Sequence, residues 1–374
     1  MLSPKSAELV EATLPAVGAA IAEISALFYQ RMFEEHPVLL RDMFNRGNQA
    51  NGTQAQALAG SIAAFASGLI AGQTPDGMLR RIAHKHVSVG VTPGQYVVVH
   101  KHLLGAVAEV LGVSDEVATA WSEVYWLMAD TLVGIERFLP QGQREHRVIA
   151  RFQETEDVVT FVVRPVDGQV RPGEPGQYVS VQVPLADGAR QIRQYSLSGR
   201  SDDALQFSVK RDGEVSNHLH DRTPVGSTVL VSQPAGDVTL QPGDGPVLLA
   251  SAGIGCTPMI SMLAELAATD SARQVIAVHG DRDQLTHPFR AELAQLVAKL
   301  EDAQAHVFYE EPIGGWPAER TGFVDLASVP VPAGTTAYLC GPMPFLRAMR
   351  TQLLAAGVTD IHYEVFGPDT ISAG

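Results

Sequence analysis

The chain has 374 residues, of which 27 are Lys or Arg and 41 are Asp or Glu, so its formal net charge is −14. This excess of negative charge opposes binding to nucleic acid, and no local basic patch offsets it. Hydrophobic residues make up 45% and charged residues 18%, which excludes a disordered chain. At about 150 residues per domain, the length predicts two or three domains.

The sequence also bears on where the protein works. No apolar run approaches the ~18 residues of a membrane span, and the N-terminal segment lacks the basic and apolar regions of a secretory signal. The two cysteines, Cys256 and Cys340, favour a reducing compartment over a disulfide framework. We therefore expect a soluble, cytoplasmic, monomeric enzyme that binds neither a membrane nor nucleic acid.

Three patterns of periodicity follow one another along the chain. Residues 1–138 carry apolar side chains at three- and four-residue spacings, which predicts an all-α domain. After a polar linker at 139–147, residues 148–243 contain short β-branched runs divided by Gly, Pro and Asp, as expected of an antiparallel β-barrel. Residues 244–374 alternate buried-type strands with helical stretches, which predicts an α/β domain with a parallel sheet.

The helical part places polar side chains on otherwise apolar faces. His86 follows Leu79, Ile82 and Ala83 at helical spacing, so it faces the core. Similar spacing turns Gln54 and Glu136 inward, and Tyr29 lies beside the apolar stripe of its helix. A buried carboxylate is costly unless it is paired, and Tyr96 could supply the partner. Each of these residues could be an ordinary satisfied core residue, but together they favour a cofactor pocket.

Two His-x-His pairs, His84/His86 and His100/His102, suggest metal binding at first sight. Residues two apart on a helix point about 200° away from each other, so one pair cannot grip one ion from a regular helix. We therefore expect neither pair to form a metal site by itself.

The segments FYQRMFEEHPVLLRDMFNRGNQANGTQAQAL and RIAHKHVSVGVTPGQYVVVHKHLL resemble the globin domain of bacterial and yeast flavohaemoglobins. The resemblance spans nearly all of residues 1–138. It implies that His86 is the proximal ligand of haem iron and that Tyr96 and Glu136 hydrogen-bond its imidazole, which favours oxygen activation over storage. It also implies a haem pocket formed by Tyr29, Phe44, Gln54, Leu58 and Lys85.

The β region contains Arg193-Gln194-Tyr195-Ser196, which resembles the flavin-binding RxYS signature of the ferredoxin-reductase superfamily. Arg suits a pyrophosphate, Tyr offers an aromatic plane, and Ser places a small hydroxyl near the flavin edge. The alternative is that Arg193 and Tyr195 are ordinary strand residues. The flanking segments PGQYVSV and GEVSNHLH also match the superfamily, with Gln177, Tyr178, Gly213, Ser216 and Asn217.

The segment SAGIGCTPM joins a buried strand to a helix through a glycine-rich turn. Glycine lets backbone amides approach a pyrophosphate, and a helix N-terminus favours its negative charge. The turn lacks the full GxGxxG pattern, but it resembles the nucleotide loop of flavin reductases, which usually have a polar residue where Cys256 stands. The expected nucleotide-binding residues are Gly253, Ile254, Gly255, Cys256, Thr257 and Pro258.

Two later segments, YLCGPMPFL and YEVFGP, resemble the nicotinamide-site and flavin-stacking motifs of the same reductases. Cys340 is expected to contact the nicotinamide rather than to act as a nucleophile, because no neighbouring base marks it. The cofactor-binding residues implied here are Cys340, Gly341, Pro342, Glu364, Val365, Phe366, Gly367 and Pro368. Asp281-Arg282-Asp283 gives contradictory signals about the coenzyme, with an inclination to NADH.

The resemblance implies an electron path from NADH or NADPH through FAD to haem b. It further implies nitric oxide dioxygenase activity, with O2 and NO as substrates and nitrate as product. Three alternatives stay open: a haem-based reductase of peroxides or lipid hydroperoxides, an oxygen-binding or gas-sensing globin with a ferric-haem reductase, and a haem-free flavin reductase.

Overall fold

The structure is a computed structural model that describes residues 2–50, 52–199 and 201–366. Its internal contacts divide the chain into two compact units. The first contains most of Met1–Gly142 together with Pro184–Ile192, and the second contains Gln143–Val183 and Arg193–Phe366.

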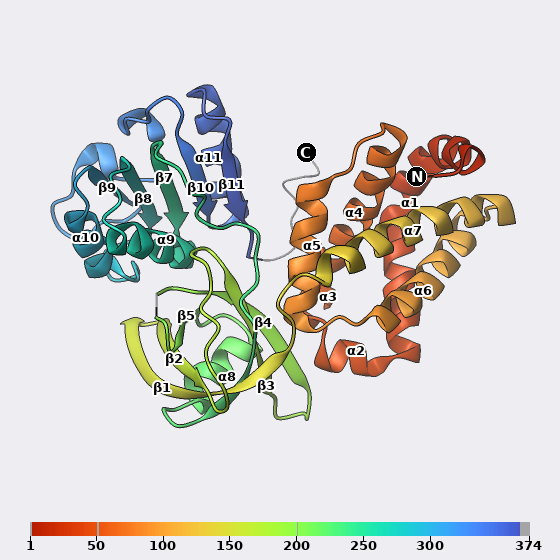
Figure 1. The fold of residues 1–374 in the computed structure, drawn as a ribbon, viewed down its shortest axis with the longest axis horizontal. Coiled ribbons are helices and arrows are strands. Elements are labelled where there is room, and N and C mark those ends of the chain that lie inside the picture. Colours follow the sequence, from red (N-terminus) through yellow and green to blue (C-terminus); the bar gives the residue numbers. More distant parts are fainter. Residues whose placement is uncertain (1, 51, 200, 367–374) are drawn as a thin grey trace. The chain divides into compact units, whose positions relative to one another are not determined.

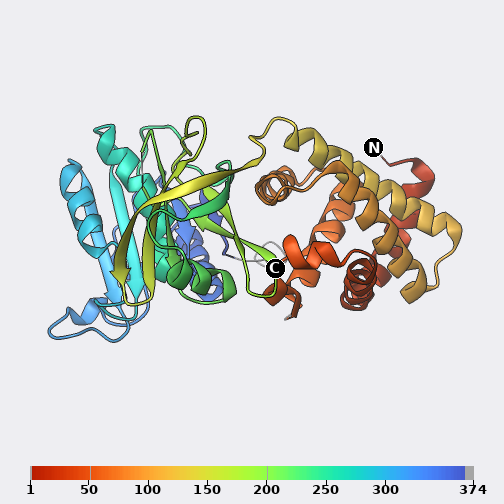
Figure 2. The same cartoon turned by 90° about the horizontal axis from the view of Figure 1, so that it is seen from below.

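The first unit is helical, which confirms the all-α prediction. Its helices are α1 (Pro4–Glu35), α2 (Pro37–Asp42), α3 (Arg46–Ala50), α4 (Thr53–Ile70), α5 (Asp76–Val89), α6 (Pro93–Leu111) and α7 (Asp115–Glu136) (Figure 1). Ser3 and Ser114 cap α1 and α7 by accepting backbone N–H bonds, and Gly90 and Gly112 end α5 and α6 in the left-handed region that glycine adopts without strain. Figure 2 shows that these helices cross one another rather than running parallel.

One helix among the described residues, α1, is long and apolar enough to cross a membrane by length and composition alone. This corrects the expectation that no apolar run approaches that length, because the many small Ala side chains of α1 raise its mean hydropathy without forming a strongly apolar block. Here α1 packs against α4, α6 and α7. Its Val10, Val17, Ile24 and Phe28 are buried in the core of the unit, as in the central helix of a globular bundle.

A short hairpin segment, Pro184–Ile192, completes the first unit. Gln191 is fully buried, and its Nε2 donates to the carbonyl oxygens of Leu40, Arg41 and Phe44 at 3.2, 2.9 and 3.2 Å. These carbonyls lie at the C-terminus of α2, where a helix leaves its last acceptors unpaired. Nearby, the backbone N–H of Arg190 donates to Asp42 Oδ1 at 3.0 Å.

The second unit begins with an antiparallel sheet, as expected. The strands are β1 (Gln143–Thr155), β2 (Val158–Pro165), β3 (Tyr178–Pro184), β4 (Arg190–Ser196), β5 (Leu205–Lys210) and β6 (Thr228–Ser232), in the order β4-β3-β6-β1-β2-β5, with α8 (Glu214–Arg222) before β6. Strand β1 begins inside the stretch expected as a linker at 139–147, because Gln143 to Arg147 pair with β6. Among these polar residues only His146 is buried, so an alternating pattern did not stand out. The domain boundaries remain predictions.

The rest of the second unit is a parallel sheet in the order β11-β10-β7-β8-β9, which confirms the predicted α/β architecture. Its elements are β7 (Val247–Ala252), α9 (Cys256–Ala268), β8 (Val275–Asp281), α10 (Arg290–Lys299), β9 (Ala303–Tyr309), β10 (Thr336–Cys340), α11 (Met343–Ala355) and β11 (Ile361–Glu364). The chain order reverses between β7 and β10 (Figure 1). Sheets of this kind bind ligands at the carboxyl ends of the strands flanking such a reversal.

We expect Gln191→Leu to destabilise the first unit, because the substitution removes the amide and leaves buried carbonyl groups unpaired. The free energy of unfolding should fall by about 1–3 kcal/mol, measured by urea denaturation followed by far-ultraviolet circular dichroism. Gln30→Leu, at an exposed position of α1, is the matched control and should change it by less than about 0.5 kcal/mol. Equal losses in the two variants would contradict this role of Gln191.

Candidate functional site

Three helices of the first unit bring His86, Tyr96 and Glu136 together, as the sequence predicted. His86 Nδ1, on α5, lies 2.8 Å from the Tyr96 hydroxyl of α6 and 3.0 Å from Glu136 Oε1 at the end of α7. The Tyr96 hydroxyl donates to the same Glu136 oxygen at 2.6 Å. Tyr96 and Glu136 are buried, so a carboxylate that would be costly alone has two hydrogen-bond partners.

The electrostatics of this cluster determine which ring nitrogen of His86 is free to bind a metal ion. Burial, and then the Glu136 carboxylate, raise the pKa of Tyr96 well above its usual range, so the phenol keeps its proton and donates it. Contact with a carboxylate favours the tautomer with its proton on Nδ1. His86 Nε2 makes no hydrogen bond with any described residue. An imidazole held at one nitrogen and open at the other fits a residue that would hold haem iron through Nε2.

The residues expected on the other side of a haem form an aromatic group around Tyr29, which is buried on α1. Its ring centroid lies 4.5 Å from that of Phe28, 5.5 Å from Phe33 and 5.9 Å from Phe44. Leu58 of α4 is half-buried against the same core, whereas Lys85 of α5 is exposed. The side chain of Gln54 lies outside the described residues.

The segment expected to bind a flavin lies on β4. The Tyr195 ring stacks on Phe207 at 5.7 Å and 21°, and Gln194 Nε2 donates to Ser180 Oγ at 2.9 Å. Burial raises the pKa of Tyr195. The Ser196 hydroxyl is buried and has no hydrogen-bond partner among the residues that the structure describes. Because such an unpaired group is costly, Ser196 fits a bound molecule that hydrogen-bonds it, as a flavin edge does.

The start of α8 lies next to this segment, because Arg193 Nη2 is 3.2 Å from Glu214 Oε1. Ser216 Oγ accepts the backbone N–H groups of Asp212 and Gly213, both at 2.9 Å, which holds the entry to the helix. Tyr178 is buried on β3. The structure therefore brings the RQYS segment and the downstream Ser216 segment together. Gln177, which precedes β3, donates from Nε2 to the Gly236 carbonyl oxygen at 3.3 Å.

The two loops expected to bind the nicotinamide nucleotide meet at the reversal of strand order. A Cβ atom at Gly255 would lie 2.3 Å from the Cys340 carbonyl oxygen and 2.8 Å from the Gly341 backbone nitrogen. Glycine is therefore required at position 255 for this close approach. In the first loop, Thr257 Oγ1 donates to the Ile254 carbonyl at 3.0 Å. Gly253, at φ 53°, and Pro258 lie in the same turn, and Pro342 precedes α11.

The remaining predicted residues follow β10 and β11. Glu364 pairs with Cys340 in the register of these two strands, and Phe366, two residues later, is 48% exposed. Val365 lies between them. Gly367 and Pro368 lie outside the described residues.

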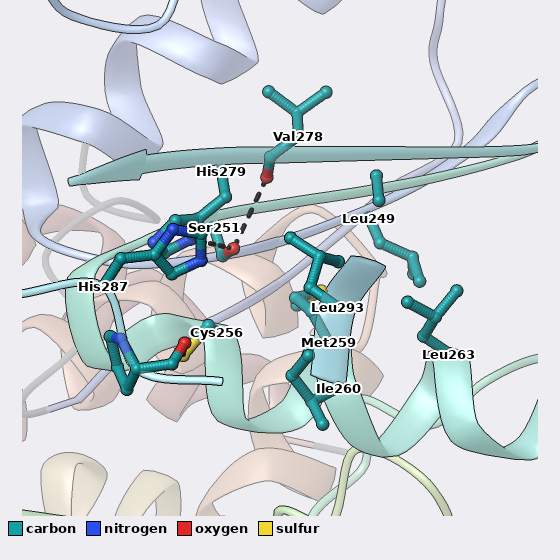
Figure 3. A pocket seen from close by; sticks show the side chains of 12 residues that line it. Leu249, Ser251, Cys256, Met259, Ile260, Leu263, Val278, His279, His287 and Leu293 are labelled. Carbon is teal, nitrogen blue, oxygen red and sulfur yellow. Dashed lines mark hydrogen bonds between the residues drawn. The ribbon is translucent and has the colours of Figure 1, made fainter. Parts of the chain in front are cut away.

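Both cysteines are buried and free. Burial raises the pKa of each thiol well above its usual range, so each stays a protonated thiol at neutral pH. The Cys256 side chain lines a small interior cavity with Met259, Leu263 and Leu293 (Figure 3). Its side chain thus faces the interior of the domain, although its backbone belongs to the nucleotide loop.

Two stacked histidines line the same cavity (Figure 3) and were missed from the sequence. The rings of His279 and His287 lie 4.0 Å apart at 27°. His279 Nδ1 is 2.9 Å from Ser251 Oγ, and His287 Nδ1 is 2.8 Å from the Tyr309 hydroxyl. Burial, followed by the neighbouring His279, lowers the pKa of His287 to about 2. The only sequence signal was His279 at the end of a buried-type strand.

Asp281, a candidate for determining coenzyme choice, forms its hydrogen bonds inside the protein. Its Oδ1 accepts from Thr286 Oγ1 and from the Arg282 backbone N–H, both at 2.7 Å. Its Oδ2 lies 3.4 Å from His279 Nε2, and its side chain is 8% exposed. Asp281 therefore holds the end of β8 in place, while the Arg282 side chain is exposed.

Comparisons with known proteins agree with the fold described above. The Globin family model matches residues 26–132, and the Oxidoreductase NAD-binding domain model matches residues 249–351. The flavohemoprotein of Rhizobium meliloti is 40% identical over 99% of this chain and 99% of its own. The flavohemoprotein of Bordetella pertussis is also 40% identical, over 98% of this chain and 99% of its own.

Two solved structures are similar. The flavohemoglobin of Malassezia yamatoensis, a crystal structure with bound FAD and heme, has a TM-score of 0.92 at 36% identity and covers 98% of this chain and 100% of its own. The FAD/NAD-binding domain of the nitric oxide dioxygenase from Vibrio cholerae has a TM-score of 0.56 at 36% identity, over 60% of this chain and 99% of its own. The predicted fold class and the predicted haem, FAD and nicotinamide cofactors are thus confirmed at the level of the family.

Because the pKa of His287 is lowered in the folded protein, this residue should make the protein less stable as the pH falls. Above its ordinary value of 6.5 the residue is neutral in both states, and as the pH falls toward about 2 only the unfolded chain takes up the proton. The free energy of unfolding should then fall by up to about 1.4 kcal/mol per pH unit for this group. His287→Gln should flatten the pH dependence of denaturant unfolding between pH 6 and 4.

The matched control is His362→Gln, because His362 is partly exposed beside Asp360. That variant should keep the slope of the parent protein. A His287→Gln variant with the parent slope would show that the folded state takes up the proton at this position.

Proposed function

The chain belongs to the flavohaemoprotein family, and from this premise we propose that it is an NAD(P)H-dependent nitric oxide dioxygenase. In this proposal residues 1–138 bind haem b, residues 148–243 bind FAD and residues 244–374 bind the nicotinamide nucleotide. The substrates are O2 and NO, and the product is nitrate. The name of the Vibrio cholerae relative supports this activity.

The observation that carries the proposal is the hydrogen-bonded group of His86, Tyr96 and Glu136. Its buried carboxylate gives the His86 ring partial imidazolate character, so Nε2 becomes a stronger electron donor. Stronger electron donation to the iron favours the activation of oxygen by an enzyme over its reversible binding by a carrier. The attached reductase module supports the same conclusion, because repeated turnover needs a supply of electrons.

When bound, haem would supply dioxygen binding, FAD would supply the change from hydride to single-electron transfer, and the nicotinamide nucleotide would supply the hydride. The electrons balance, because one hydride carries two electrons and each conversion of NO and O2 to nitrate consumes one electron. This chain's residues would position these groups. His86 would hold the haem, Ser196 would hydrogen-bond the flavin edge, and Tyr29 offers a phenolic donor in an otherwise apolar pocket.

The direct test is consumption of NO by the holoprotein with NADH or NADPH under air, with nitrate measured as the product. We expect oxygen-dependent turnover, with about one coenzyme oxidised for every two nitrates formed. His86→Ala should abolish this turnover and the Soret absorbance while keeping FAD. The nucleotide that gives the larger kcat/KM settles the coenzyme.

Each other outcome identifies another function. Reduction of peroxides without oxygen-dependent NO loss would favour a hydroperoxide reductase. Stable O2 binding without turnover would favour a carrier or sensor, and a full Soret band in His86→Ala would remove His86 as the ligand.

A second test addresses Glu136 as a positioning residue. Glu136→Gln keeps the shape but removes the charge, so the haem reduction potential should rise because the imidazole donates less electron density to the iron. Tyr96→Phe is the matched variant, since it leaves the His86–Glu136 contact in place and should shift the potential less. Spectroelectrochemical titration measures both. A rise in Tyr96→Phe that equals the rise in Glu136→Gln would contradict the role of the carboxylate.

A further inference from the structure

A second group of ligand-type side chains lies in the helical unit, apart from the residues assigned to haem. It consists of Glu35, the last residue of α1, His36, which joins α1 to α2, and His102 on α6. One ligand atom from each residue lies within 4.8 Å of the others. We call these three residues the Glu35 cluster. It combines the adjacent residues Glu35 and His36 with His102, which is remote in sequence, so the argument against a His-x-His pair does not apply to it.

His102 is the most informative member of the Glu35 cluster. The residue is 6% exposed, and its buried Nε2 has no hydrogen-bond partner among the described residues. The closest carboxylate oxygen, Glu35 Oε2, is 3.6 Å away, which is too far for a hydrogen bond. Burial lowers the pKa of His102, so the imidazole is neutral at pH 7 and its Nε2 lone pair is available to a metal ion.

The three ligand atoms lie within 4.8 Å of one another, a spacing from which a metal ion could draw them together. His36 Nε2 is 3.6 Å from Glu35 Oε1, and His102 Nε2 is 3.6 Å from Glu35 Oε2. Ligands of a tetrahedral ion with bonds of about 2.0–2.1 Å lie roughly 3.3 Å apart, so the three side chains must rotate toward one another to bind the ion. We propose that the Glu35 cluster binds a divalent transition metal ion of the zinc class, with two imidazoles and one carboxylate as protein ligands and water in the fourth position.

The cluster is accessible from the surface. Glu35 and His102 line a depression of about 360 Å³ together with Arg31, Glu34, Lys101 and Gly105. Arg31 is paired with Glu109 and does not need the Glu35 carboxylate. A metal ion can therefore reach the cluster with the protein folded.

Lys101 competes for the same carboxylate. Its Nζ lies 2.5 Å from Glu35 Oε1 and 2.7 Å from Oε2. The Lys101 side chain is 61% exposed, and an ion pair this exposed contributes little to stability. Metal binding must displace this ammonium group, so the metal affinity is lower than the three ligands alone would give. Removing the ammonium group is therefore a specific test of the site.

A bound ion would join the end of α1 to α6. Tyr29 lies on α1 less than two turns before Glu35, and Tyr96 lies on α6 less than two turns before His102. The metal site would therefore fix the relative position of the helices that carry the two tyrosines assigned to the haem pocket. It would stabilise the folded protein, because the unfolded chain does not hold these three residues together.

The experiment is a zinc titration of the purified holoprotein after chelator treatment, read by competition with a chromogenic chelator. The wild type should bind one equivalent. His36→Ala, at a partly exposed position, should weaken zinc binding by about tenfold or more, because even the loss of a group that orients a ligand costs 10–100-fold. Lys101→Gln should tighten zinc binding several-fold, since it removes the competing ammonium group.

His362→Ala is the control for adventitious binding. His362 has a side-chain exposure of 33%, against 36% for His36, and it also lies beside a carboxylate, that of Asp360. This variant should bind zinc as the wild type does. X-ray absorption at the zinc edge should show two imidazole ligands in the wild type and one in His36→Ala.

Three results would overturn the proposal: a wild type without a stoichiometric site, equal weakening in His36→Ala and His362→Ala, or unchanged affinity in Lys101→Gln. None of these readouts depends on the haem reaction, so the test stands whether or not the protein oxidises NO.

Discussion

The structure of the helical unit depends on the burial of one carboxylate. Glu136 is 6% exposed at the end of α7, and an unpaired charge there would be too costly to keep. His86 of α5 and Tyr96 of α6 meet it at hydrogen-bonding distance. One electrostatic requirement thus fixes three helices relative to one another. It also sets the tautomer of His86 and the direction of its open nitrogen, so stability and ligand geometry have the same source.

In the parallel sheet, a steric constraint fixes two loops relative to each other. The loops after β7 and β10 approach so closely that Gly255 has no room for a side chain beside the Cys340 carbonyl. The close approach places two chain segments, far apart in sequence, at the edge where a nucleotide would bind. Side chains behind this edge are occupied with one another, as in the stacked His279 and His287. The nucleotide-binding edge is therefore shaped by the close approach of two backbone segments, and the packed side chains of the domain interior support it.

The sequence was sufficient for the architecture and for the inward-facing positions of His86 and Glu136, because both leave periodic signals. His86 shares a helical stripe with Leu79 and Ala83, and the strands of the parallel sheet are continuous apolar runs. The linker was the weaker prediction, since polar residues of β1 hid the alternation around His146. Other features were not predictable. Gln191 with the carbonyls of α2, and Glu35 with His102, meet only after folding, and nothing in their local spacing marks them.

The hairpin Pro184–Ile192 has an implication for how the protein is made. Chains generally fold domain by domain from the N-terminus while the ribosome extends them. Here the C-terminus of α2 depends on the Gln191 amide, which is synthesised well after the last helix of the unit. The nascent helical part must therefore wait, with that helix end exposed, until strands β1 to β3 and the start of β4 have left the ribosome. Biosynthetic order, and not only the finished contacts, ties the maturation of the haem-binding unit to the reductase part of the chain.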